Sequence, residues 1–259
     1  MNLKVKGLVL AAVAALVLNG CDSGSEQVDS VGKEMKKVLD QAGEDLGDIV
    51  KHSDATIEKK LENKFHLTHS DAVYVTEHNK AEADYVVNDV LVPVFADIKF
   101  KFSSTSTKTE NTNATRVLGQ IAFVLNSQEF QDRFDANPIP DACCSLGVDD
   151  AKMPPADFVA FKNVVNDRTQ QWKDKTLLIS IDGTNRHQAI LGQPNLYLNK
   201  FEVQDTATLS SNAPLLLQRL TSAFGYSNDK APDSIPYYVQ LMTKQDGARK
   251  DDLFKKFFG

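Results

Sequence analysis

The stretch VPVFADIKFKF, residues 92–102, decides the fold class that we expect for this chain. Apolar residues occupy its even positions, a period of two that is typical of a strand with one buried face. Pro93 lies near the start, where a missing backbone donor is tolerated. A polar segment, SSTSTKTENTN at 103–113, separates it from a second apolar run at 116–126. The pattern predicts a long β-hairpin.

Outward from this hairpin, the chain mixes short strands and separate helices. We expect strands at 71–76, 176–181, 187–191 and 196–204, and helices at 128–134, 154–172, 214–224, 237–243 and 251–258. Strands and helices do not alternate regularly, which favours an α+β fold with a mostly antiparallel sheet and packed helices over residues 65–259.

Two flanking segments show the three- to four-residue spacing of amphipathic helices. Residues 28–64 carry an apolar stripe opposite a charged face, which predicts a helix, or a helix pair, ahead of the sheet. At the other end, Phe254, Phe257 and Phe258 share one helical face. This tail fits either a docked terminus or a helix lying on a membrane surface, and its short length favours docking.

The first twenty residues have the pattern of an exported precursor. Lys4 and Lys6 supply positive charge, and residues 7–18 form an apolar run. A run of about a dozen residues suits a signal peptide, whereas about 20 are needed to span a bilayer. We therefore expect residues 1–20 to be a signal peptide.

The motif LNGC at residues 18–21 resembles the lipobox of bacterial lipoproteins, with Asn19 where a small or β-branched residue is usual. The resemblance covers residues 1–21 only. It implies cleavage before Cys21 and attachment of diacylglycerol and a further acyl chain, such as palmitate, to that cysteine. Two or more lipid signals suffice for stable anchoring in a membrane.

The residues after the lipobox fit the same interpretation. Residues 21–27 form a short polar stretch that resembles a flexible tether between a lipid anchor and a folded domain. Asp22 resembles the inner-membrane retention signal of enteric bacteria. The resemblance implies a chain in the cell envelope that faces the periplasm, held at the inner membrane where that sorting rule applies.

The charge of the chain limits its partners. Its 259 residues carry a net charge of −6, and removing residues 1–20 removes Lys4 and Lys6 but no acid, which leaves −8. An acidic chain without a Lys/Arg cluster is poorly suited to neutralise phosphates along a nucleic acid, so no nucleic-acid partner is expected.

Two adjacent cysteines, Cys143 and Cys144, lie in a proline-rich loop. A disulfide normally needs Cα atoms about 4.4–6.8 Å apart, and neighbours across a trans peptide lie at about 3.8 Å, so a vicinal disulfide is strained. Buried thiols, a vicinal disulfide, and a metal or redox site remain alternatives. The pair lacks the CxxC spacing of thioredoxin-like proteins, and we favour a structural role.

The histidines do not predict a metal centre or any other cofactor. His66 and His69 are one helical turn apart and form the nearest candidate for a metal site. With an extended segment at 71–77, His69 and His78 would lie up to about 25–30 Å apart and could not share one ion.

No GxSxG, P-loop or HExxH motif occurs in the chain, so the sequence favours a binding protein over an enzyme. We expect a membrane-anchored interaction module with a protein partner in the envelope. Two alternatives stay open. One is a periplasmic hydrolase or redox protein with its site near Cys143 and Cys144, and the other is an inhibitor or immunity-type lipoprotein.

Overall fold

Helices dominate the part of the chain that the structure, a computed structural model, describes. This part comprises residues 53–88, 99–137, 157–172, 176–182, 194–203, 206–227, 234–244 and 252–259. Its helices are α3 (Asp54–Phe65), α4 (His69–His78), α5 (Lys80–Asn88), α6 (Lys108–Asn126), α7 (Gln128–Ala136), α8 (Phe158–Gln171), α9 (Lys200–Val203), α10 (Thr206–Ala223), α11 (Ile235–Met242) and α12 (Leu253–Phe258). Its strands are β1 (Lys99–Phe102), β2 (Thr176–Asp182) and β3 (Asn195–Asn199).

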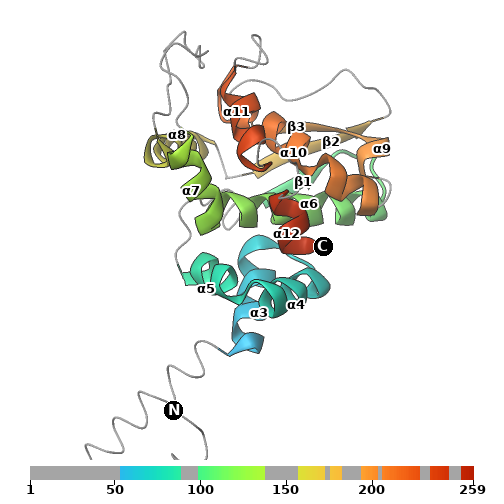
Figure 1. Ribbon diagram of the computed structural model, residues 1–259. Helices are drawn as coiled ribbons and strands as arrows, with labels where there is room; N and C mark the ends of the chain where they lie inside the picture. The colour runs from blue at the N-terminus through green and yellow to red at the C-terminus, as the bar shows by residue number, and fades with distance from the viewer. Residues whose placement is uncertain are drawn as a thin grey trace, which may run out of the picture. The chain divides into compact units, whose positions relative to one another are not determined.

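Helix α6 is the central element of this part of the chain. It begins with a capping box, in which the Thr107 hydroxyl accepts from the Glu110 amide at 3.2 Å and the Glu110 carboxylate accepts from the Thr107 amide at 2.8 Å. Every residue from Val117 to Asn126 is buried. The helix contacts α3, α7, α9, α10 and α12, and Figure 1 shows it between the α3–α5 group and the sheet.

The three strands form a parallel sheet in the order β1-β2-β3. Phe100 pairs with Leu177, and Ile179 pairs with Leu196. The prediction of a mostly antiparallel sheet is therefore wrong, and the fold is mostly helical with a small parallel sheet. Parallel neighbours need long crossover connections, and α6, α7 and α8 all lie between β1 and β2.

The predicted hairpin is wrong because its second strand is the second half of α6. An apolar run that is buried on all sides shows no decisive period, so 116–126 fits a strand and a helix equally well. Of the first predicted strand, the structure describes the end, which forms β1. Residues 92–98 lie outside the described residues. The strand expected at 71–76 is also wrong, because these residues belong to α4.

Other predicted elements are confirmed within a few residues. These are β2, α7, α8, α11 and α12. The strand expected at 196–204 is correct only in its first half, since β3 ends at Asn199 and residues 200–203 form helix α9. The helix expected from Pro214 starts earlier, at Thr206, with the proline inside it. Of the amphipathic segment 28–64, the structure describes α3, which buries Ile57 and Leu61. The strand expected at 187–191 lies outside the described residues.

The C-terminal helix α12 is docked on the core, as its short length predicts. Phe254 and Phe257 are buried, and Phe257 makes an edge-to-face contact with Phe123 of α6 at 5.2 Å between ring centroids. Helix α12 also contacts α4 and α10. Among the described residues, none of the helices combines the length and the apolar character needed to cross a membrane.

Candidate functional site

A surface hollow of about 300 Å³ lies between the turn that joins α3 to α4 and the first three turns of α6. Its lining consists of His66, Leu67, Thr68, Lys108, Asn111, Thr112, Thr115 and Arg116. One wall is therefore the start of helix α6, and the other is the short loop between α3 and α4. We take this hollow as the candidate site because it gathers cationic and hydroxyl side chains from two separate elements.

The loop wall is held against α6 by a close backbone approach. Helix α3 ends at His66, whose φ of 55° places it in the left-handed region where glycine is more common. On the opposite side, a Cβ added at Gly119 would lie 2.2 Å from the carbonyl oxygen of Phe65. Only glycine at this position of α6 lets the end of α3 pack so closely.

A bidentate ion pair fixes the base of the hollow. Arg116 donates from Nε to one carboxylate oxygen of Asp71 at 2.8 Å and from Nη2 to the other at 2.7 Å. The Asp71 side chain is 3% exposed, and the Arg116 side chain is 24% exposed. The hydrogen bonds to Asp71 raise the pKa of Arg116 above its ordinary value. The guanidinium is thus held in one orientation by two hydrogen bonds, and its side chain stays partly exposed.

The first turn of α4 helps to place the acidic partner of this pair. The Thr68 hydroxyl caps α4 by accepting from the backbone amide of Asp71 at 3.1 Å. Gln120 of α6 also donates to the Asp71 carboxylate, at 3.4 Å. Since the same aspartate is held by a cap and by two side chains of α6, the orientation of Arg116 is determined by the packing of α4 on α6.

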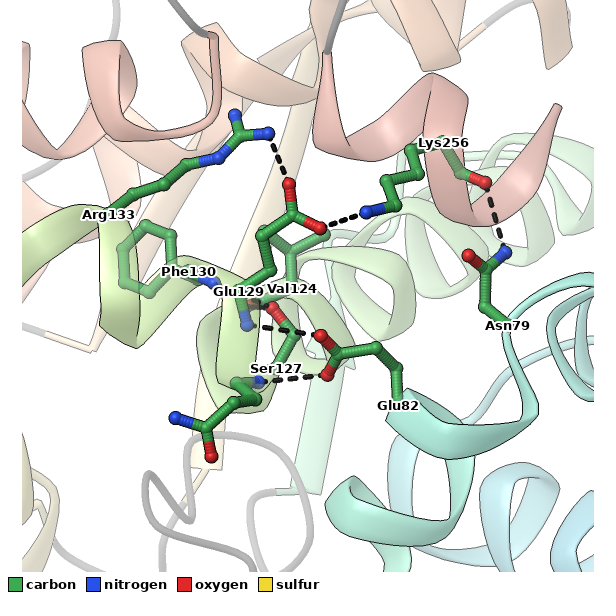
Figure 2. Close-up of polar contacts among 9 residues, drawn as sticks. Asn79, Glu82, Val124, Ser127, Glu129, Phe130, Arg133 and Lys256 are labelled. Carbon is green, nitrogen blue, oxygen red and sulfur yellow. Dashed lines mark hydrogen bonds and ion pairs between the residues drawn. The ribbon is translucent and has the colours of Figure 1, made fainter.

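A second polar cluster lies just beyond the C-terminal end of α6 and joins α5, α7 and α12 (Figure 2). The Glu82 carboxylate accepts from the backbone amides of Gln128 and Glu129, at 2.9 and 3.1 Å, and so caps the start of α7. Glu129 in turn forms ion pairs with Arg133 and Lys256. Every charged group of this cluster has a partner inside it.

The two glutamates of the cluster titrate in opposite directions. Burial raises the pKa of Glu82 and outweighs its two backbone hydrogen bonds. Burial acts in the same sense on Glu129, but hydrogen bonds and charges from Lys256 and Arg133 prevail and lower its pKa. Asn79 completes the attachment of α12 by donating to the carbonyl of Lys256 at 3.1 Å.

Most of the residues singled out in the sequence lie outside the described residues. These are Cys21, Asp22, Cys143 and Cys144. The two candidate metal ligands are described, and they lie in different surroundings. His66 packs on Phe100 and lines the hollow, whereas His69 pairs with Glu62 at 2.7 Å. No group of three or more potential metal ligands occurs among the described residues.

The α6 side of the hollow was not predicted from the sequence. Residues 108–116 were expected to form a polar turn and the start of a strand, and a loop gives no reason for Lys108, Asn111 and Arg116 to share a face. The signal that identifies them is Thr107-x-x-Glu110 ahead of an apolar run, which is the pattern of a capping box.

Comparison of the chain with models of protein families, with curated proteins and with solved structures found no match.

Proposed function

We propose that this chain is a lipoprotein of the bacterial cell envelope, anchored through Cys21 and facing the periplasm, whose folded region binds an envelope partner. The observation that carries the proposal is the pattern of residues 1–21, with Lys4 and Lys6, an apolar run and the motif LNGC. A cysteine that carries three acyl chains would anchor the chain stably.

The binding part of the proposal is supported by the rigidity of the candidate hollow. Asp71 and Gln120 hold Arg116 in place, and Gly119 allows the loop wall to pack directly on α6. A wall that is already ordered loses little conformational entropy when it binds, which favours recognition.

Lipid attachment is tested by growing cells with a labelled palmitate analogue. The wild-type chain is expected to incorporate the label, and Cys21→Ser is expected to lose it. Cys143→Ser is the matched control, since it removes a different cysteine and should leave labelling unchanged. Label that persists in Cys21→Ser would contradict the anchor.

The membrane that holds the chain is tested separately. We propose that Asp22 retains it at the inner membrane, so Asp22→Ser should move it to the outer-membrane fraction of a density gradient. An identical distribution of wild type and variant would rule out sorting by Asp22 without affecting the lipid anchor.

The partner is tested by affinity purification of a tagged chain from solubilised envelopes. A specific partner should appear in the mass spectrum at near-stoichiometric amounts and disappear when excess untagged chain is added. The absence of any protein that behaves in this way would argue against an interaction module and favour a small-molecule ligand.

A further inference from the structure

The hollow beside α6 is more positive than the chain as a whole. The described residues that line it include Lys108 and Arg116, and none of these described residues is acidic. Asp71 lies behind Arg116 and occupies its Nε and Nη2 groups, which leaves Nη1 for another partner. The chain around it carries a net charge of −6. This surface therefore attracts anions locally although the whole protein does not.

Lys108 supplies the charge that is not compensated. Its side chain is exposed at the first residue of α6, and within the described residues it makes no ion pair or hydrogen bond. The nearby acid Glu110 is engaged with the Thr107 backbone and lies 4.0 Å from Lys200. The positive end of the α6 dipole acts in the same direction as Lys108.

A second observation points to a ligand in the hollow rather than to bulk counter-ions. The Asn111 amide oxygen is buried and finds no hydrogen-bond donor among the described residues. A buried acceptor without a donor is unfavourable, because it has lost its hydrogen bonds to water. Asn111 lines the hollow, and a rotation of its side-chain amide would bring this oxygen within reach of a donor on a bound molecule.

We propose that the hollow binds a phosphate group, carried either by a soluble molecule or by a lipid headgroup. A phosphate presents several oxygens in different directions, which suits the remaining edge of the Arg116 fork and the point charge of Lys108 together. Its P–O–H group, or a hydroxyl of the attached molecule, donates to Asn111. The inference rests on the binding part of the proposed function, for which it names a ligand, and it does not depend on the lipid anchor.

The polar cluster in Figure 2 serves as an internal comparison. It also contains two cations, Arg133 and Lys256, but Glu129 lies between them and pairs with both. A phosphate would have to displace this carboxylate. The same residue types therefore form a structural contact in one place and an open anion site in the other.

The test is a titration of the purified, isotope-labelled full chain, in non-ionic detergent at constant pH and ionic strength, followed by amide NMR. Two probes are used separately: inorganic phosphate, and glycerophosphoglycerol, which is the headgroup diester of phosphatidylglycerol without its acyl chains. We expect saturable shifts of the amides of residues 108–116. Saturation with phosphate alone identifies a soluble phosphate, and saturation with the diester identifies a lipid headgroup.

The variant that decides the question is Lys108→Glu. An acid in the first turn of a helix is favourable, so the variant should fold. It should weaken binding of whichever probe saturates by about tenfold or more, because it replaces a charge-assisted contact with repulsion. Lys59→Glu is the matched control, since Lys59 is an exposed helical lysine outside the hollow. No saturable shift with either probe, or equal affinity in Lys108→Glu and wild type, would overturn the proposal.

Discussion

Two polar sites, one at the start of α6 and one just beyond its end, contain similar residues but have different roles. At the hollow, Asp71 and Arg116 form a bidentate ion pair. Arg116 lines the hollow, and Asp71 lies behind it. In the second cluster, Glu82 caps α7 and Glu129 joins Arg133 to Lys256. The cations that the central carboxylate contacts separate the two sites. Glu129 pairs with both Arg133 and Lys256, whereas Asp71 pairs with Arg116 and, among the described residues, no acid pairs with Lys108.

The largest effect that we expect is a loss of stability when an apolar contact of the C-terminal helix α12 is removed. Phe257→Ala should lower the free energy of unfolding by about 3–5 kcal/mol, because the ring is fully buried against Phe123 and its removal leaves a cavity. Urea denaturation measures this change. Phe258→Ala, at a partly buried neighbour, should cost less. Equal losses in the two variants would contradict docking through Phe257.

The next effect tests whether the ion pair between Asp71 and Arg116 stabilises the fold. Arg116→Ala leaves the buried Asp71 carboxylate without its main partner and should cost about 3 kcal/mol in a urea melt. The matched change in the other cluster is Lys256→Ala, where the side chain is 45% exposed. It should cost at most about 1 kcal/mol. A larger loss for Lys256→Ala than for Arg116→Ala would reverse the comparison.

A third variant examines the packing that brings the two walls of the hollow together. In an ordinary helix Gly→Ala stabilises by about 1 kcal/mol. Gly119→Ala should instead destabilise by roughly 1–3 kcal/mol, because the new Cβ would lie 2.2 Å from the Phe65 carbonyl oxygen. A raised melting temperature in differential scanning calorimetry would show that α3 and α6 can separate without cost.

The smallest effect that we expect is a difference in the pH dependence of stability between the two glutamates of the second polar cluster. Since the pKa of Glu129 is lowered below its ordinary value of 4.5, its ionised form stabilises the fold above that pH, and this stability is lost as the pH falls. Glu129→Gln should therefore cost about 0.5–1 kcal/mol at neutral pH and progressively less below pH 4.5.

Glu82 is the matched control for this pH dependence. Its pKa is raised, so its contribution to stability is greatest at low pH and is lost as the pH rises through the pKa of the folded state. The stability of wild type relative to Glu82→Gln should fall with rising pH, whereas relative to Glu129→Gln it should increase. If the two stability differences changed with pH in the same direction, the pKa values of Glu82 and Glu129 would not be shifted in opposite directions.

The elements that could be predicted from the sequence are those with one exposed face or a clear end signal. Helices α7 and α11 begin at the serine caps Ser127 and Ser234, and β2 alternates between buried and partly exposed positions. Helix α6 could not be assigned by period, because burial on all sides removes the contrast between its faces. Its capping box was the only local evidence, and the apolar period of the stretch before it favoured a hairpin instead.

The candidate hollow was predictable only in part. His66 stood out as a histidine, although the structure gives it a different role, as the left-handed end of α3 that lines the hollow. The partnership of Asp71 with Arg116 spans 45 residues of sequence, and nothing in the local pattern links them. Only the packing of α4 on α6 places the two side chains together.

The sequence by itself determined the local features: where several helices start, the strand character of β2, and the N-terminal pattern that suggests export and lipid attachment. These depend on caps, spacing and charge within a few residues of one another. Only the tertiary structure decided that the sheet is parallel, that 116–126 is a central helix, and that Lys108 and Arg116 face one hollow. Strand direction, burial on all sides and charge pairing between helices arise from contacts between distant segments, and so they leave no periodic trace in the chain.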